Sequence, residues 1–325
     1  MVMLSTPLQA ALIGYDGFSY PLSAGLPGQN GGEGFAGSWL AGVNAGVPTA
    51  RFQIFTPSLS YPGLASDGVR LRVTAGAAQG ARRLLAQPMG ADGTVRYMSL
   101  LVRPDATPSA STYFGLQLLG NAGSDLFAGK PGGGATQRYV LENAGGAGQV
   151  ATTCDVTANA VALLVFRLEF NAGNDRISLY VNPSLGSGEP AIADAVKTDL
   201  NLGTTVVPAL TGPAAWSADE LRVGDTFASV TPPAPDFQLR TILSGSTVEH
   251  VEVTRQIETV DPLPVGRTLA FVLVGEGYGA QIDPVTGLFT WVPGELEGGQ
   301  RRTFTVRATS NATPPPLSRP RSTST

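Results

Sequence analysis

The residues with the clearest chemical potential are the carboxylates, because two of them held together can hydrolyse a glycosidic bond. Retaining hydrolysis needs two carboxyl groups about 5–5.5 Å apart, which on one strand face means acids at alternate positions. In the first two-thirds of the chain Glu169 stands alone on its expected strand, and Asp175 lies beyond the following loop. Glu295 and Glu297 do alternate, but glycines flank them, which predicts a loop.

Nucleophile and base pairs are equally poorly represented, since the chain has one His and one Cys. His250 has Glu249 and Glu252 as near neighbours, which favours a solvent-facing strand position over a catalytic base. Cys154 has no base nearby, and a small buried or half-buried apolar role is expected. One Cys also excludes an internal disulfide or a four-cysteine zinc site. We therefore expect no catalytic residues, no enzyme and no bound cofactor other than a metal ion.

Calcium is the metal ion that the sequence leaves open, because Ca²⁺ takes six to eight oxygen ligands from carboxylates and carbonyls. Oxygen donors in suitable places are Asp16, Asn171, Asp175 and Asn182, although sequence alone cannot bring them together. Asp283, which precedes a proline, is better explained as a turn former.

Aromatic side chains gather near the N-terminus and allow two interpretations. They can form a platform on which sugar rings stack, or they can pack at the edge of the core. The packing interpretation is favoured, and the ligand candidates kept are Tyr15, Tyr20, Trp39 and Tyr61.

The elements that must position these residues are predicted to be strands. Apolar and polar residues alternate over runs of four to eight residues, which is typical of half-buried strands. The apolar positions are Phe52 and Ile54; Val69, Leu71 and Val73; Met98, Leu100 and Val102; Phe114, Leu116 and Leu118; Leu164, Phe166, Leu168 and Phe170; and Ile177, Leu179 and Val181. Residues 171–175 predict a hairpin loop, and 219–224 predict the last strand of the first domain.

The composition agrees with an all-β class. The 41 Gly and 25 Pro residues interrupt the chain too often for long helices, while 42% hydrophobic residues suffice for proper cores. A net charge of −4 without a basic cluster argues against nucleic-acid binding. No apolar run approaches the roughly 18 residues of a membrane span, so membrane insertion is not expected.

The domain organisation follows from one proline-rich segment. We expect a large two-sheet jelly-roll sandwich over 14–231, a linker over 232–238, a small immunoglobulin-like or cadherin-like sandwich over 239–312, and a disordered tail over 313–325.

Several segments of the first domain resemble a known family. They are Gly14-Tyr15-Asp16-Gly17-Phe18, the glycine-rich block 31–39, Leu59-Ser60-Tyr61-Pro62, residues 126–130, Leu179-Tyr180-Val181-Asn182-Pro183 and the strand 219–224. Together they resemble the laminin G-like, concanavalin A-like jelly-roll domains of bacterial surface and secreted proteins. Residues 1–13 do not make a convincing secretory signal, so the location must be inferred from the resemblance. The resemblance implies an extracellular or cell-surface location.

The second domain resembles a dystroglycan-type cadherin-like, or immunoglobulin-like, repeat. The residues that carry this are Val265–Leu269, Gly279–Asp283, Thr286–Trp291 and Phe304–Ala308. Members of that family tend to have an acidic residue where this chain has Ser310, which argues against calcium there. Such repeats occur in tandem, so we expect the chain to belong to a longer multidomain protein.

Three functions follow from these expectations. The first is a non-catalytic binding or adhesion module with a carbohydrate or a surface protein as partner. The second is a structural spacer without a ligand. The third is a glycan-active hydrolase, which a clustered acid pair in a cleft would favour.

Overall fold

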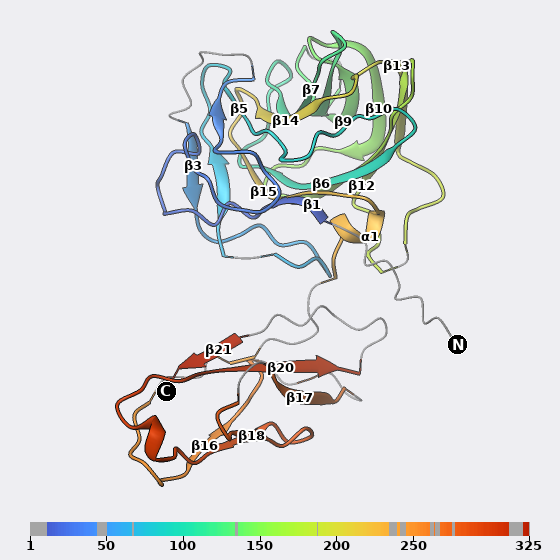
Figure 1. Cartoon of the computed structure of the whole chain (residues 1–325). Coiled ribbons are helices and arrows are strands. Elements are labelled where there is room, and N and C mark those ends of the chain that lie inside the picture. The colour runs from blue at the N-terminus through green and yellow to red at the C-terminus, as the bar shows by residue number, and fades with distance from the viewer. Residues whose placement is uncertain are drawn as a thin grey trace, which may run out of the picture. The chain divides into compact units, whose positions relative to one another are not determined.

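The computed structural model describes residues 12–43, 51–66, 68–133, 136–186, 188–233, 239–240, 245–260, 263, 267–274, 277–311 and 321–324. The chain divides between Pro232 and Pro233 into a larger and a smaller unit, and the smaller one is coloured orange to red in Figure 1. The sequence analysis placed the domain boundary at the start of its linker, 232–238. Residues 234–238 of that linker lie outside the described residues.

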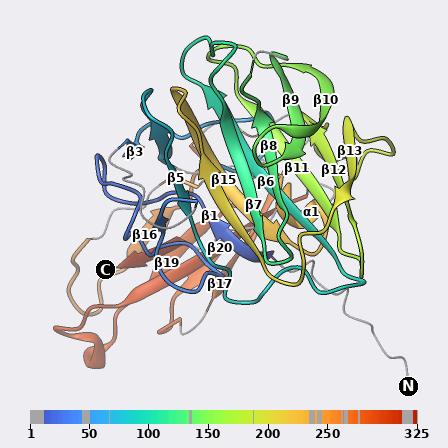
Figure 2. The same ribbon diagram turned by 90° about the horizontal axis from the view of Figure 1, so that it is seen from above.

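The larger unit is a jelly-roll β-sandwich of two antiparallel sheets (Figure 1, Figure 2), which confirms the predicted all-β fold. The eight-stranded sheet has the order β13-β12-β11-β6-β15-β4-β3, with β1 paired to β15. Its strands are β1 Leu12–Asp16, β3 Phe52–Phe55, β4 Arg70–Val73, β6 Val95–Pro104, β11 Ala162–Glu169, β12 Asp175–Val181, β13 Ala195–Leu200 and β15 Trp216–Gly224.

The seven-stranded sheet has the order β10-β9-β8-β7-β14-β5-β2. Its strands are β2 Leu40–Ala41, β5 Gly80–Arg82, β7 Phe114–Gly120, β8 Asp125–Lys130, β9 Arg138–Asn143, β10 Ala147–Asp155 and β14 Val206–Thr211. Strands β7 to β10 form a meander, in which each strand pairs with the next along the chain.

The main core lies between the two sheets and contains nearly all the apolar positions predicted from alternation. Met98, Leu100 and Val102 of β6 are buried there, as are Phe114, Leu116 and Leu118 of β7. Only Val69 lies at the margin, where it is partly buried. A period of two in the sequence therefore identified the inward faces correctly, because alternate side chains of a strand point to opposite faces.

Strand β15 departs from this period at a bulge. Trp216, Ala218, Leu221 and Val223 all enter the core, so one extra residue separates the two pairs. The register shifts between Asp219 and Arg222, and Glu220 adopts a left-handed φ of 55°. Without this residue, continued alternation would turn Glu220 and Arg222 into the core. The bulge also marks the point where the neighbour of β15 changes from β4 to β1.

The outer face of the eight-stranded sheet is covered by the chain itself. Helix α1 Phe227–Val230 and the loop before β4 supply Phe227, Val230, Leu59 and Leu64. These residues form a second hydrophobic cluster with Tyr97, Leu101, Leu163, Val165 and Tyr180 of the sheet. Thr226 caps the helix, since its hydroxyl accepts from the Ser229 backbone N–H at 3.1 Å.

The smaller unit has two three-stranded sheets with a core of its own. Their orders are β16-β19-β18 and β17-β20-β21. The strands are β16 Val253–Gln256, β17 Leu269–Val274, β18 Gln281–Ile282, β19 Leu288–Trp291, β20 Thr303–Ser310 and β21 Arg321–Ser324. The core cluster contains Phe271, Phe289, Trp291, Phe304 and Val306.

Three expectations for the smaller unit need correction. His250 lies in a turn with a φ of 60°, not on a strand. Glu295–Glu297 form the short 3₁₀ helix η1, in which Glu297 pairs with Arg302. Residues 313–320 and 325 of the expected disordered tail lie outside the described residues. Strand β21 falls within that tail, and its backbone pairs with β20.

The turn before β19 has the predicted chemistry. The Oδ1 atom of Asp283 accepts from the backbone N–H groups of Val285 and Thr286, at 2.9 and 2.7 Å. Gly287 takes the left-handed conformation with a φ of 71°. No helix among the described residues is long and apolar enough to cross a membrane.

Candidate functional site

Two of the four aromatic ligand candidates are core residues held by one carboxylate. Trp39 and Tyr20 are buried, with exposed fractions of 1% and 9%. The Oδ2 atom of Asp16 accepts from Trp39 Nε1 at 2.7 Å, from the Tyr20 hydroxyl at 2.5 Å and from Arg83 Nη1 at 2.5 Å. The Phe18 backbone N–H donates to Oδ1 at 2.8 Å. These aromatic rings therefore anchor the N-terminal segment.

The other two aromatic candidates also have structural contacts. The half-buried Tyr15 hydrogen bonds to Glu220, and burial raises the pKa of its hydroxyl. Tyr61 packs against the second cluster and donates to the Pro183 carbonyl at 3.2 Å. The interpretation of these residues as packing is thus the one that their contacts support.

The calcium candidates do not converge on one point. Asp175 is buried at the start of β12 and accepts from the backbone N–H groups of Asn171 and Leu202. Asn182 follows the other end of β12, where its Oδ1 accepts from the Leu163 N–H. Asp16 lies on β1, which β15 and β6 separate from β11. Among the described residues there is no group of three or more His, Cys, Asp or Glu that could hold a metal ion.

Asp219 and Glu220 form an acid pair that the sequence analysis did not single out as chemistry. Both are fully buried, and Arg222 pairs with Glu220. Burial, reinforced by the charge of Glu220, raises the pKa of Asp219 well above its usual range. Asp219 accepts from the Ser58 hydroxyl and the Leu59 N–H, so it fastens the covering loop. The structure therefore shows this pair holding the fold, through the covering loop and Arg222.

The outer face of the seven-stranded sheet has a different character. Leu116, Leu118, Leu126 and Leu141 point into the main core. The residues that alternate with them along the strands therefore point to the outer face. None of Gln117, Phe127 and Glu142 belongs to any of the three hydrophobic clusters. This face is therefore the best candidate for a binding surface on the larger unit.

Cross-strand register brings Gln117, Phe127 and Glu142 together, and side-chain contacts add Tyr113 and Gln149. We call these five side chains the outer row. Gln117 is paired directly with Phe127, and Phe127 directly with Glu142. Gln149 Nε2 donates to Glu142 Oε2 at 2.8 Å. The Tyr113 ring meets the Phe127 ring edge-on, with centroids 5.8 Å apart.

The outer row is tightly packed. Phe127 and Glu142 each expose 5% of their surface and Gln117 exposes 9%, while Tyr113 and Gln149 are half-buried. Burial raises the pKa of Glu142, which the hydrogen bond from Gln149 and the charge of Lys197 partly oppose. Side chains held in this way lose little rotamer freedom when a ligand arrives.

Two glycines place no side chains of their own beside Phe127. Gly115 and Gly129 pair directly with each other in the neighbouring register position. A Cβ atom on Gly129 would lie 2.2 Å from the Phe114 carbonyl oxygen, and one on Gly115 would lie as close to the Ala128 oxygen. The loop before β7 is fixed by the buried Lys130, whose Nζ donates to the carbonyls of Ser109, Ala110 and Thr112.

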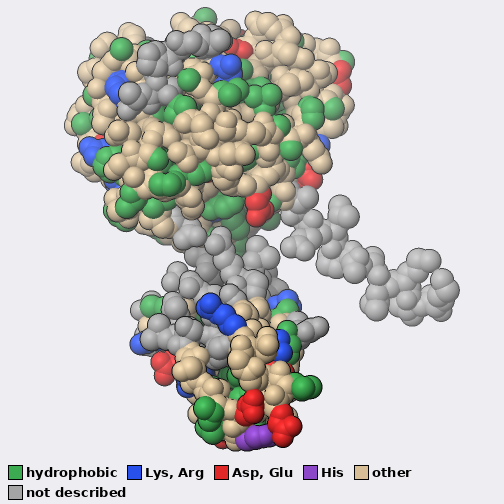
Figure 3. Space-filling view, turned by 60° about the vertical axis from the view of Figure 1, so that its left-hand side comes forward, with side chains coloured by type: hydrophobic (Ala, Val, Ile, Leu, Met, Phe, Trp, Pro, Cys, Tyr) green, Lys and Arg blue, Asp and Glu red, His purple; other side chains and the backbone are tan. Residues whose placement is uncertain are grey.

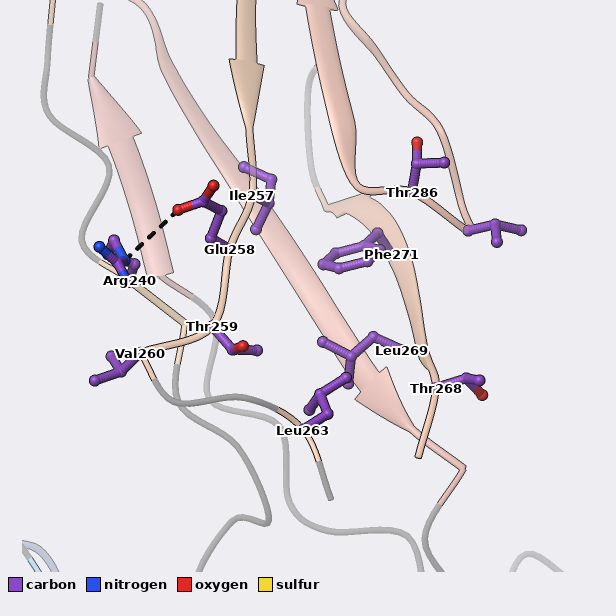
Figure 4. Close-up of a pocket in the computed structure, with 11 residues that line it drawn as sticks. Arg240, Ile257, Glu258, Thr259, Val260, Leu263, Thr268, Leu269, Phe271 and Thr286 are labelled. Atoms are coloured by element: carbon purple, nitrogen blue, oxygen red, sulfur yellow. Dashed lines mark ion pairs between the residues drawn. The ribbon is translucent and has the colours of Figure 1, made fainter. Parts of the chain in front are cut away.

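The smaller unit also has hollows, but their linings are less suggestive. Figure 4 shows a cavity of about 590 Å³ beside β17, into which Ile257, Leu269 and Phe271 project. Ile257 and Phe271 belong to the unit's core cluster, so the cavity is an opening of that core. Its two charged lining residues, Arg240 and Glu258, pair with each other at 3.7 Å. A second hollow of about 840 Å³ lies between His250, Trp291 and Arg301.

The sequence analysis missed the outer row. Gln117 alternates with Leu116 and Leu118, and Glu142 follows the buried Leu141, so each reads as an ordinary outward residue. Cys154 was placed correctly, since it lies half-buried against the main core. The signal that joins the outer row is cross-strand register, which one strand's sequence does not contain.

Comparisons with known proteins add the fold and little more. No family model and no curated protein matches the chain. Solved structures that it resembles include domain 4 of an extracellular GH43 arabinanase from Geobacillus stearothermophilus, in complex with arabinotriose, at 14% identity. That likeness covers 67% of this chain and 93% of the other, with a TM-score of 0.42.

Two further structures are enzymes. A β-1,3-glucanase from Mycobacterium marinum is 13% identical over 66% of this chain and 99% of the other, with a TM-score of 0.40. An endo-1,3-β-glucanase from Streptomyces sioyaensis is 13% identical over 63% and 99%, with a TM-score of 0.38.

These findings correct the expectation that the chain is not an enzyme. Several of the structures that it resembles are named as glycan-cleaving enzymes, so a jelly roll of this kind gives no ground for that exclusion. The physical reason is that activity depends on a few side chains on a face and not on the scaffold. Likeness at this level transfers no residue role to the chain.

Proposed function

We propose that the larger unit binds carbohydrate on the outer face of its seven-stranded sheet. The observation that carries the proposal is the outer row, where two amides and a carboxylate stand next to a pair of aromatic rings. Sugars present hydroxyl groups and apolar C–H faces together, so they need both kinds of contact at once.

The extent of the face favours an oligosaccharide. From Gln149 on β10 to Gln117 on β7 the row crosses four neighbouring strands, and Ala209 and Arg82 continue the same register on β14 and β5. Strands lie roughly 4.8 Å apart, so this face is about 24 Å wide from β10 to β5. The opposite sheet offers no equivalent, because the second hydrophobic cluster covers it.

The test is a glycan array followed by calorimetric titration of the best ligand. Tyr113→Leu keeps an apolar side chain but removes the ring, and we expect it to weaken binding about tenfold, or roughly 1.4 kcal/mol. Gln117→Ala should weaken binding by a similar factor through lost hydrogen bonds.

The matched control is Tyr61→Leu, which changes another half-buried tyrosine on the far side of the same unit. It should leave affinity unchanged. Equal losses in Tyr113→Leu and Tyr61→Leu would assign the effect to stability, and an array without any hit would reject the proposal.

Hydrolysis is a second candidate because of one observation at Glu142. Burial raises the pKa of this carboxyl group, as a general acid requires. If the row cleaves its ligand, Glu142→Gln should retain binding and release no new reducing ends. Binding without any product from the unaltered protein would leave recognition as the function.

We also propose the families that the two units resemble in sequence. The larger unit is then laminin G-like and the smaller unit is a cadherin-like spacer. The chain would work in a secreted or surface-bound protein. A spacer alone, without a ligand, is the alternative that a blank array would favour.

A further inference from the structure

Two acidic side chains on the outer face, Asp125 and Glu142, have no ion-pair partner among the described residues. Asp125 lies one register step from Gln117 on the same face, and its Oδ2 accepts from Gln117 Nε2 at 3.2 Å. Neither carboxyl group is therefore directly paired with a cation, although the charge of Lys197 acts on Glu142 and lowers its pKa.

The cations near the face are already engaged. Arg82 turns its Nη1 toward the carbonyls of Gly42 and Val43, at 3.0 and 3.1 Å. Lys197 is buried at the sandwich edge, where its Nζ donates to the Gly148 carbonyl at 2.6 Å and pairs with Asp199 at 2.8 Å. Withdrawing either cation to meet an anionic ligand would break contacts that hold β2 or the β9–β10 turn.

Figure 3 shows basic side chains scattered singly over the visible face of the larger unit, without a basic patch. An approaching anion would meet the carboxyl groups of Asp125 and Glu142, and like charges brought together at a binding face weaken binding.

We propose that the outer row selects neutral oligosaccharides and rejects glycans that carry carboxylate or sulfate groups. This inference rests on the proposed carbohydrate binding and names its ligand class. The hydrogen-bond acceptors of Asp125 and Glu142 suit sugar hydroxyls, which donate, whereas an anionic substituent offers only acceptors. The preference for neutral ligands thus comes from repulsion of anionic groups as much as from attraction of sugar hydroxyls.

The experiment compares ligands that differ only in charge. An array of neutral oligosaccharides is printed with their carboxymethylated and sulfated derivatives, and the best neutral ligand and its carboxymethylated form are then titrated. We expect the charged form to bind at least about tenfold more weakly, and added salt to narrow the difference because it screens the carboxylates.

Two variants test whether these carboxyl groups cause the weaker binding of charged ligands. Asp125→Asn and Glu142→Gln should each reduce the discrimination several-fold, with thermal melts to show that each protein is folded. Asp225→Asn is the control, because Asp225 pairs with Arg96 of the other sheet, away from the outer row. Equal or tighter binding of the charged form would overturn the inference and leave carbohydrate binding intact. Binding of neither form would overturn both.

Discussion

At the scale of single residues, Asp16 explains the aromatic cluster near the N-terminus. Its buried carboxylate takes donors from Trp39, Tyr20 and Arg83, while the Arg83 guanidinium lies 4.3 Å from the centre of the Phe35 ring. A buried ion pair contributes to stability only when its remaining hydrogen bonds are satisfied. Here Trp39 and Tyr20 serve as hydrogen-bond partners of Asp16 as well as apolar residues.

Two buried tryptophans allow this role to be measured. Trp39 Nε1 donates to Asp16, whereas Trp216 Nε1 has no partner among the described residues. Both side chains are buried and each contacts a Phe ring. Trp39→Phe should therefore lower the free energy of unfolding by about 2 kcal/mol more than Trp216→Phe, because only the first removes a hydrogen bond to a charged group.

Urea denaturation of the two variants gives the comparison. Equal losses would mean that loss of ring volume alone sets the cost, and that the bond to Asp16 adds nothing.

At the scale of elements, the glycine-rich block 31–39 fits beside β1. Tyr15 and Glu33 exchange two backbone hydrogen bonds, of 2.9 and 2.8 Å. Gly34 lies so close to β1 that a Cβ atom would be 1.8 Å from the Ile13 carbonyl oxygen. Glycine is required at this position for two reasons: a side chain would clash with β1, and the φ is 77°.

Gly28 is the matched control for Gly34. It also has a positive φ, of 90°, but a Cβ atom there would meet nothing within 4 Å. Gly28→Ala should cost about 1–2 kcal/mol from its left-handed conformation alone. Gly34→Ala should cost about 1–3 kcal/mol more, because β1 must shift.

Thermal melts of both variants measure these costs. Similar melting temperatures would show that β1 adjusts without loss, and that the close approach is not needed for stability.

The elements also show what the sequence could and could not predict. Alternation identified the buried faces of β6, β7, β11 and β12, because period two is a local property. The four-residue helix α1 was missed, since one turn is too short to show a helical period. The bulge at Glu220 was missed because its positive φ is rare outside glycine.

The candidate site was less predictable than the fold. Residues 117, 127 and 142 are ten and fifteen positions apart, and only the pairing of β7, β8 and β9 brings them into one row. Polar residues on an outward face look the same in sequence whether they bind a ligand or only water. The conspicuous aromatic residues drew attention because of their type, yet their partners show that they are structural.

At the scale of the whole molecule, each unit has a complete core of its own. A chain that ends after Pro232 should keep the larger unit's melting temperature within about 3 °C, the shift that roughly 1 kcal/mol produces in a domain of this size. Pro232 is retained because its carbonyl accepts from the Ala65 N–H at 3.1 Å.

Calorimetry of the full and shortened chains tests this independence. As a control, a chain that ends after Gly224 lacks α1, which uncovers the second cluster, and its melting temperature should fall clearly. If the Pro232 chain melted as early as the Gly224 chain, the larger unit would need residues from the smaller one.

The position of β15 has a consequence for the order in which the molecule is made. This strand is the last of the larger unit, yet it lies between β6 on one side and β4 and β1 on the other. As the chain leaves the ribosome, β1, β3 and β4 cannot join β6 until residue 224 has emerged. Their unpaired edges stay open to wrong partners in the meantime, since pairing over such long sequence separations is intrinsically slow.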